Sequence, residues 1–248
     1  MWAFGSGGHL SSISSSYDDI ASEYYDHRRH PTCRNFTEAS QGFVGRLLPH
    51  QLSGICVDIG AGRSILCKLL SSRDLKLHNC ILLDSSRPML AYSAEYVSRG
   101  ARLIVADATA IPLRHGSCTL IVASLGDPYN TIAFWGEVAR CLAPAGTCIF
   151  TTPSYEWTKD FRQLSPKERD RFAYFELRDG RSLYLPSWVY SVEDQIKLIE
   201  STGLCVDYSE TIPGASLSAP ISPKLRTASG LVASPIVGFR VVWSRAGT

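Results

Sequence analysis

The chain has 248 residues, of which 45% are hydrophobic and 19% are charged, and its composition offers no point at which to divide it into two domains. No apolar run approaches the ~18 residues that a membrane-spanning helix needs, so we expect no membrane contact. The net charge of +2 is small and evenly spread, so we do not expect binding to duplex nucleic acid.

Residues 1–16 are rich in Gly and Ser and are predicted to be flexible, which leaves 17–248 as a single domain. From there on, short apolar runs alternate with longer segments of helical periodicity, which is typical of βαβ units around a parallel sheet. Because these runs are apolar almost throughout, we expect helices on both faces of a seven-stranded, mostly parallel sheet in an α/β fold. The predicted strands are 55–59, 80–83, 102–105, 119–124, 147–151, 204–208 and 236–243, and the predicted helices are 35–48, 63–71, 87–98, 131–142 and 191–202.

One segment departs from this alternation. After the fifth strand come a charged stretch, 157–171, that is predicted to be helical, and an aromatic stretch, 172–188. Within the second stretch, Asp179-Gly180 indicates the turn of a β-hairpin. We predict that residues 154–190 form a helix and hairpin insertion that covers the sheet edge and acts as a lid over a substrate.

A glycine turn between the first strand and its helix is the first candidate binding site. Residues 57–64 read Val-Asp-Ile-Gly-Ala-Gly-Arg-Ser, and glycine there lets the backbone turn tightly and a ligand approach without a Cβ in the way. A dinucleotide-binding motif has Gly or Ala at its sixth position, where this chain has Ile65, which disfavours NAD. Asp58 favours S-adenosylmethionine (SAM) instead, because a carboxylate matches the positively charged amino-acid portion of SAM.

Two further carboxylates end the next two strands. Asp84 follows the second strand, at about the distance downstream where such folds place a ribose-binding carboxylate. Asp107 follows the third strand, where it could accept a hydrogen bond from an adenine amino group. Any one of these aspartates could be only a helix cap, but three consecutive strands with this ending favour a binding site.

With these residues in place, the sequence resembles the class I SAM-dependent methyltransferases, in particular the small-molecule and quinone-biosynthesis group, over residues 17–208. The resemblance implies a Rossmann-like fold, SAM as the cofactor, S-adenosylhomocysteine as its product, and an N-terminal segment that folds over the cofactor. Ser64 stands where many members have a third glycine, and Ala145 replaces one glycine of a Gly-Gly pair, but neither position must contact SAM. The matching segments are 17–26, 57–62, Asp84 with Met89-Leu90, 107–113 and 137–146. The implied cofactor-binding residues are Tyr17, Tyr25, Asp58, Gly60, Ala61, Gly62, Asp84, Ser85, Met89, Asp107, Ala108, Ser124 and Leu125.

The segment after the fourth strand lies where these folds present the acceptor to the sulfonium. Amino-methylating members of the wider superfamily carry Asn/Asp-Pro-Pro-Tyr there, and this chain has Asp127-Pro128-Tyr129, one proline short. N-methylation of a nucleobase or a protein amine is therefore one alternative, and a simple turn that caps the next helix is another. If the acceptor needs a base, the candidate catalytic residues are Asp127, Tyr129 and His30.

Substrate contacts are predicted from two clusters. Arg28, Arg29 and Arg34 belong to the most concentrated charge in the chain and could hold a phosphate or carboxylate, although a solvated surface turn would look the same. The aromatic residues of the insertion, with Tyr155 and Trp188 as the candidates, suggest an apolar or planar substrate. A hairpin that packs on the sheet edge or forms a homodimer contact would use the same residues.

The eight cysteines are scattered without a Cys-x-x-Cys pair, which predicts reduced core residues in a cytoplasmic protein and no metal site. The leading prediction is a methyltransferase that acts on a small molecule. The alternative from another class is a non-catalytic SAM-binding subunit of a complex, which the intact motifs disfavour. An NAD-linked oxidoreductase is also disfavoured, because no Tyr-x-x-x-Lys pair follows the glycine turn.

Overall fold

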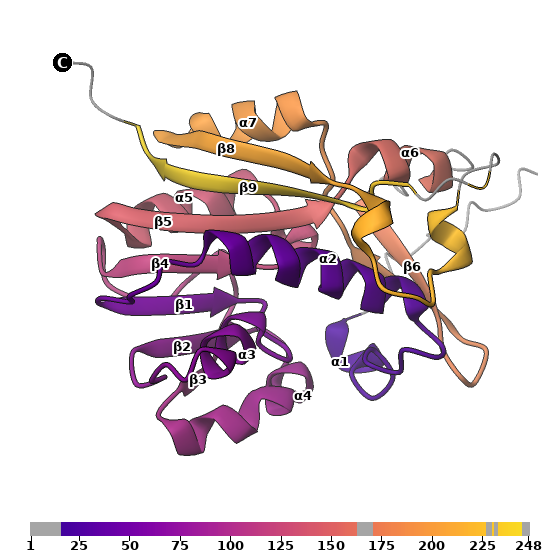
Figure 1. Cartoon of the computed structure of the whole chain (residues 1–248), viewed down its shortest axis with the longest axis horizontal. Helices are drawn as coiled ribbons and strands as arrows, with labels where there is room; N and C mark the ends of the chain where they lie inside the picture. The colour runs from indigo at the N-terminus through magenta and orange to yellow at the C-terminus, as the bar shows by residue number, and fades with distance from the viewer. Residues whose placement is uncertain (1–15, 163–170, 227–229, 231–232, 245–248) are drawn as a thin grey trace, which may run out of the picture.

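The computed structural model describes residues 16–162, 171–226, 230 and 233–244, and the first fifteen residues of the predicted flexible segment lie outside this part. At its centre is a seven-stranded sheet with the order β3-β2-β1-β4-β5-β9-β8 (Figure 1). Only β9 runs antiparallel to its neighbours, so the predicted mostly parallel α/β sheet is confirmed. The strands are β1 Ile55–Ile59, β2 Cys80–Asp84, β3 Arg102–Val105, β4 Cys118–Ala123, β5 Leu142–Pro153, β8 Leu204–Ile212 and β9 Ile236–Trp243.

Helices cover both faces of the sheet, as predicted. Alternate residues of the strands point to opposite sides: Cys56 packs with buried residues of α2 and α3, whereas Val57 packs with those of α5 and α7. Helix α2 begins earlier than predicted, at Pro31, because proline presets the backbone angle of a first helical turn. The helices are α1 Tyr17–Ile20, α2 Pro31–Leu47, α3 Ile65–Ser72, α4 Arg87–Leu90, α5 Ile132–Cys141, α6 Tyr155–Arg162 and α7 Val192–Glu200, and the 3₁₀ helices are η1 Ala91–Arg99, η2 Asp127–Tyr129, η4 Gly214–Ser216 and η5 Pro223–Leu225.

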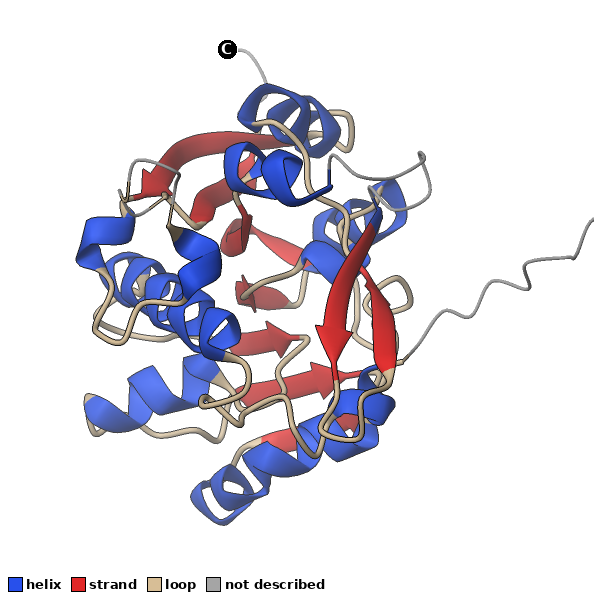
Figure 2. Ribbon diagram, turned by 90° about the vertical axis from the view of Figure 1, so that its right-hand side faces the viewer, coloured by secondary structure: helices blue, strands red, loops and turns tan. Residues whose placement is uncertain are grey.

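The segment after β5 contains the predicted hairpin. Strands β6 (Phe172–Glu176) and β7 (Ser182–Pro186) pair antiparallel around a turn in which Gly180 has a positive φ of +83°. The hairpin does not cover the sheet edge, which β3 and β8 form. It lies across the carboxyl ends of the parallel strands, which face the viewer in Figure 2. Helix α6 occupies the start of the predicted 157–171 helix, and 163–170 lie outside the described residues.

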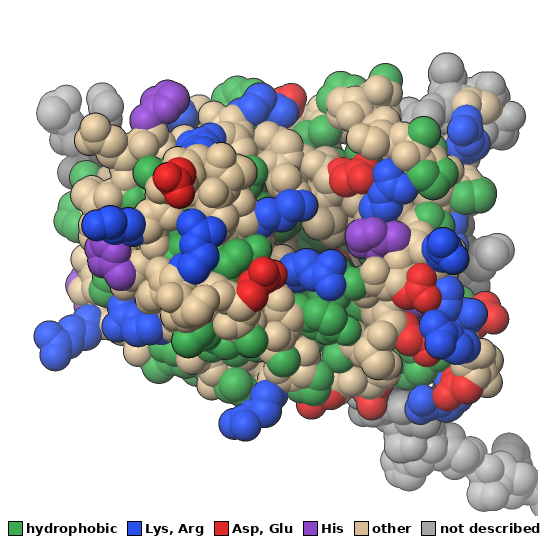
Figure 3. Space-filling model, turned by 60° about the horizontal axis from the view of Figure 1, so that its bottom comes forward, with side chains coloured by type: hydrophobic (Ala, Val, Ile, Leu, Met, Phe, Trp, Pro, Cys, Tyr) green, Lys and Arg blue, Asp and Glu red, His purple; other side chains and the backbone are tan. Residues whose placement is uncertain are grey.

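The surface charges are mixed and most of the cysteines are buried. Figure 3 shows Lys and Arg side chains interspersed with acidic and uncharged ones on the face that it displays. No helix among the described residues is long and apolar enough to cross a membrane. The cysteines are free thiols, and all except Cys33 and Cys205 are buried.

Candidate active site

Two adjoining cavities lie at the carboxyl ends of the parallel strands. The first has a volume of about 330 Å³ and is bounded by the glycine turn, the ends of β2 and β3, and the loop after β4. The second has a volume of about 1010 Å³ and is bounded by the start of α2, α6, the hairpin and η5. Tyr17, Tyr24 and Leu125 line both cavities, so molecules held in the two would meet at these residues.

The glycine turn is shaped by neighbouring tyrosines as well as by its own backbone. Gly60 has a φ of +64°, and a Cβ on it would lie 2.6 Å from the hydroxyl oxygen of Tyr129. Gly62 also has a positive φ, of +42°, and a Cβ on it would collide with the hydroxyl of Tyr25. Any larger residue at either position would therefore be strained for two reasons: the positive φ disfavours a side chain, and a tyrosine hydroxyl occupies the space of the Cβ. Gly60 and Ala61 line the first cavity, whereas Gly62 lies just outside its lining.

Asp58 is the deepest carboxylate of the first cavity, with 1% of its surface exposed. Its Oδ2 accepts hydrogen bonds from the Ser64 hydroxyl, at 2.5 Å, and from the Leu66 amide, at 3.3 Å. Burial raises its pKa to about 7 despite these two donors. A cation beside it would restore the charged form, which is the property expected of a binding partner for an ammonium group.

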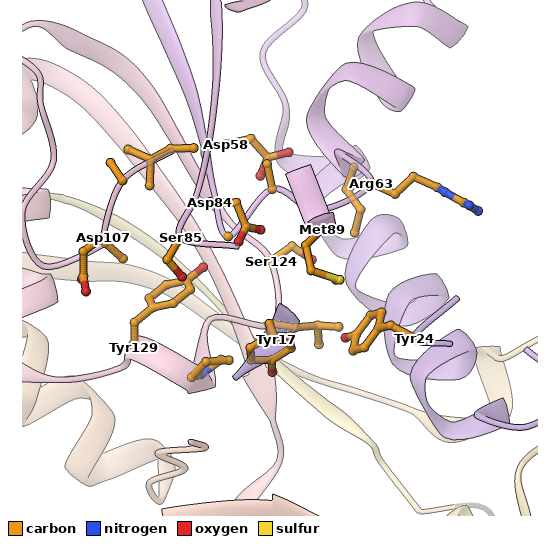
Figure 4. Close-up of a pocket in the computed structure, with 18 of the residues that line it drawn as sticks. Tyr17, Tyr24, Asp58, Arg63, Asp84, Ser85, Met89, Asp107, Ser124 and Tyr129 are labelled. Carbon is orange, nitrogen blue, oxygen red and sulfur yellow. The ribbon is translucent and has the colours of Figure 1, made fainter. Parts of the chain in front are cut away.

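Asp84 holds the turn between β2 and α4 in place. Its Oδ2 accepts from the Gly62 amide and its Oδ1 from the Ser86 amide, both at 2.9 Å. Each carboxylate oxygen has a second lone pair, so Asp84 can still accept from two hydroxyls of a ligand. Burial raises its pKa above the ordinary value. Asp84 thus joins the glycine turn to the end of β2 and lines the first cavity, where it lies above Tyr17 in Figure 4.

Asp107 and its neighbours complete the far end of the first cavity. Asp107 is exposed, and its Oδ1 accepts from the amide and the hydroxyl of Thr109, each at 2.7 Å. The loop beyond it is held by an ion pair on α5, since Glu137 accepts from the Ile111 amide and Arg140 donates to the Ile111 carbonyl. Three further residues of the predicted cofactor set line this cavity: Ser85, Met89 and Ala108.

The N-terminal segment closes the first cavity. The hydroxyl of Tyr25 accepts from the Arg63 amide at 2.6 Å, and the Arg63 guanidinium lies 4.5 Å from the centre of the Tyr25 ring. Tyr17 and Tyr24 lie on the side opposite Asp84 and Asp107 in Figure 4. Sequence reasoning missed Tyr24 and Arg63, although each adjoins a residue that it selected.

The loop after β4 separates the two cavities. Leu125 has a positive φ of +54°, which is unusual for a residue with a side chain, and its amide donates to the Thr151 hydroxyl at 2.9 Å. The Ser40 hydroxyl bonds both Thr151, at 2.7 Å, and Ser124, at 2.6 Å. This buried hydroxyl cluster holds Leu125 between the cavities and places Ser124 in the lining of the first.

The structure separates the two candidate bases of this loop. Asp127 lines the second cavity, is 7% exposed and accepts a hydrogen bond from the Ser187 hydroxyl. Tyr129 lines the first cavity, and its hydroxyl donates to the Ile59 carbonyl at 2.7 Å. Burial raises the pKa of Tyr129, so its phenol stays protonated and supports the glycine turn. Tyr129 thus lies on the side of the first cavity, and its role at the acceptor stays a prediction.

Some of the residues predicted to contact the substrate or act as a base line the second cavity. Arg28, Arg29 and His30 line it, and Arg29 forms a salt bridge of 3.4 Å with Glu23. Lys224, which the sequence did not single out, lines it as well.

Three predicted substrate contacts line neither cavity. Arg34 pairs with Glu38 at 2.8 Å and also donates to the Ala219 carbonyl, so it anchors the loop before β9. Trp188 stacks with Arg171 at 4.7 Å, and Tyr155 is 43% exposed on α6. Their roles as substrate contacts stay predictions, which the lining of the two cavities does not support.

Residues 57–150 match the model of a methyltransferase domain. Within residues 57–150 the chain is therefore similar to methyltransferases in sequence, and this match covers less than half of its length. No curated protein matches the chain in sequence.

Solved structures share the fold of this chain at low sequence identity. A chain in the complex of the Haloferax volcanii Trm112 methyltransferase activator with a methyltransferase is 16% identical, with a TM-score of 0.68, and the match covers 94% of this chain and 100% of that chain. A SAM-dependent methyltransferase from Listeria monocytogenes is 14% identical, with a TM-score of 0.64 and coverages of 84% and 99%. DhpI in complex with SAM and HEP is 18% identical, with a TM-score of 0.62 and coverages of 91% and 93%. SAM is the cofactor of this class of domain.

Proposed function

We propose that the protein transfers a methyl group from SAM in the first cavity to a small molecule in the second. The observation that carries this proposal is the junction of the two cavities at Tyr17, Tyr24 and Leu125. A methyl group can pass between two molecules only where they touch. DhpI, which shares the fold, is seen in a complex with SAM.

The first cavity suits SAM along its whole length. In our proposal Asp58 holds the ammonium group, Asp84 accepts from the ribose hydroxyls, and Asp107 accepts from the adenine amino group. All three carboxylates line one cavity and end consecutive parallel strands, as a ligand laid across the strand ends requires. When bound, SAM supplies a methyl group on a sulfonium that is already activated for displacement.

Asp127 is the proposed catalytic base of the second cavity. Asp127 lines the second cavity while its neighbours Leu125 and Pro128 line the first, which supports a role for its carboxylate near the junction. The Ser187 hydroxyl and the Trp188 amide, which donates to the Asp127 carbonyl at 2.7 Å, fix its position. Asp127 would orient the attacking atom of the acceptor and take its proton, while proximity supplies most of the acceleration. His30 is the second candidate for this role.

The alternative of N-methylation through Asp127-Pro128-Tyr129 requires both the carboxylate of Asp127 and the ring of Tyr129 at the acceptor, and the position of Tyr129 does not favour this. In that motif the tyrosine ring would stack on the acceptor, but Tyr129 lines the cofactor side and is bonded to Ile59. A nitrogen acceptor would therefore depend on Asp127 alone.

Calorimetric titration with SAM and with S-adenosylhomocysteine tests the cofactor, and release of S-adenosylhomocysteine with a panel of acceptors tests the transfer. We expect saturable binding of both compounds. Asp127→Asn should lower turnover at least about a hundredfold while SAM affinity stays the same. Ser187→Ala is the matched control: it removes the hydrogen bond to Asp127 and should cause a smaller loss. Absence of SAM binding would refute the proposal.

A second candidate function is a subunit whose activity needs a partner protein. One observation favours it: β3 is an open edge strand, and Val105 on it and Val97 on the preceding η1 are each 50% exposed. An edge strand with exposed apolar residues is suited to pairing with another chain. One protein of similar fold is part of a complex with the Trm112 activator. Turnover that appears only when a Trm112-type activator is added would support this candidate.

We also propose a cytoplasmic location. Free cysteines, most of them buried in the core, suit a reducing compartment.

A further inference from the structure

The walls of the second cavity are largely aromatic. Phe36 and Trp157 meet edge to face with their ring centres 4.9 Å apart, and Phe172 and Phe175 of the hairpin line the same space. The volume of about 1010 Å³ lies at the upper end of the range of pockets for small molecules. A flat apolar body of two or more fused rings would fill such a space better than a flexible polar chain.

Cationic side chains line the same cavity. Arg28 lies on the loop before α2, and Lys224 lies on η5. Within the described part of the chain, neither Lys224 nor Arg28 forms a salt bridge. The backbone of Lys224 is fixed, because its carbonyl accepts from the indole of Trp157 at 2.8 Å. The cavity thus presents two cations that form no ion pair with a described residue, and its lining also contains two acidic residues, Asp127 and Glu176.

His30 adds a polar group without a partner. Its Nε2 is buried, and among the described residues it has no hydrogen-bond partner. Burial is the main cause that lowers the pKa of His30, while the nearby carboxylates of Glu23 and Asp26 raise it and the cations Arg29 and Lys224 lower it. A buried nitrogen without a partner is costly unless a ligand supplies the missing hydrogen bond.

The positions of these groups suggest how an acceptor would be oriented in the second cavity. Arg28, His30 and Lys224 line only the second cavity, whereas the residues flanking Asp127 reach the first. An acceptor with its reactive atom at Asp127 would therefore place another part of itself against the cations.

On the basis of the proposed function, we propose that the acceptor is a planar aromatic molecule that carries an anionic group, a carboxylate or a phosphate. The anionic group lies against Lys224, Arg28 and His30, the rings lie among Phe36, Trp157 and the hairpin, and the atom to be methylated lies at Asp127. A cationic amine placed at this end of the cavity would be repelled by Lys224 and Arg28.

The test uses two probes of the same shape and different charge, 2-naphthoate and 2-naphthamide, in calorimetric titrations of the full chain without SAM. We expect naphthoate to bind at least about tenfold more tightly, since a charged hydrogen bond or ion pair in a cavity has about this effect. Lys224→Met should lower naphthoate affinity about tenfold and leave naphthamide affinity unchanged. Lys76→Met, on an exposed residue before β2 at the opposite end of the sheet, is the matched control and should change neither. 2-Naphthyl phosphate, compared with naphthoate, then separates the two anionic groups.

Equal affinity for naphthoate and naphthamide would overturn the inference, as would a Lys224→Met variant that weakens both probes equally. Failure of both probes to bind would also contradict it, because an aromatic cavity of this size should accept a two-ring molecule. Lys224 is exposed, so its replacement should not affect folding, and a thermal melt checks this. A protein that binds naphthoate selectively but does not bind SAM would refute the proposed function and leave the anion preference established.

Discussion

The buried carboxylate of Asp58 predicts how SAM binding depends on pH. Burial raises the pKa of Asp58 to about 7, and an ammonium group beside it would favour the charged form. SAM would then bind the deprotonated protein, and binding at pH 7 would release about half a proton per molecule of SAM on average. Affinity should therefore fall as the pH drops below 7, whereas the ligand-free fold, which favours the protonated form, gains stability in the same direction.

The size of the effect follows from the fraction of deprotonated Asp58. With a pKa of about 7, about half of the molecules are deprotonated at pH 7 and about a tenth at pH 6, so the dissociation constant should rise about fivefold between these values. Calorimetry at pH 6.0, 6.5 and 7.0, in two buffers of different ionisation enthalpy, measures both the affinity and the proton release. Asp58→Asn should bind SAM weakly and lose the pH dependence. Asp107→Asn, which alters an exposed carboxylate of the same cavity, should retain it. A wild-type dissociation constant that is equal at pH 6 and pH 7 would refute the pairing of Asp58 with the ammonium group.

Three further substitutions test the first cavity. Asp84→Ala should weaken SAM binding by about 1–3 kcal/mol, the usual loss when a buried hydrogen-bonding partner is removed, and calorimetry with an unchanged affinity would place Asp84 outside the site. Gly60→Ala adds a Cβ 2.6 Å from the Tyr129 hydroxyl at a φ of +64°, so we expect a lower melting temperature and lost SAM binding; a melting temperature like that of wild type would contradict this. Arg140→Leu removes the donors that hold the carbonyls of Ile111 and Leu113 and should speed amide hydrogen exchange in the loop beyond Asp107, with exchange elsewhere as the internal control.

Most of the fold could be predicted because its signals are local. The apolar runs fix the strands, and the residues that end them, Asp58, Asp84 and Asp107, reach one cavity because parallel strands share a carboxyl edge. The hairpin was also a local signal, since Asp-Gly between aromatic runs favours a tight turn. Its place across the strand ends was not predictable, because it depends on packing against α1, which is distant in the sequence.

The second cavity was harder to predict for the same reason. Lys224 and Trp157 meet through a hydrogen bond across 67 positions of the chain, and no pattern near either residue indicates it. Arg34 was predicted to contact the substrate because it follows a basic cluster. In the structure it lies in the first turn of α2, and its guanidinium donates to the Ala219 carbonyl in the loop before β9. The position of Tyr129 likewise depends on the carbonyl of Ile59, seventy positions earlier.

The N-terminal segment and the hairpin behave as one cover over both cavities. Ile20 of α1 is fully buried against Leu183 and Leu185 of the hairpin, and the carboxylate of Glu23 accepts from the Arg178 amide at 3.0 Å. The same segment closes the first cavity through Tyr25 and contributes Tyr17 and Tyr24 to both. A ligand that displaces this segment to enter the first cavity must also disturb the roof of the second. Filling either cavity would then hold the shared cover over the other, which couples the binding of cofactor and acceptor without any movement of the sheet.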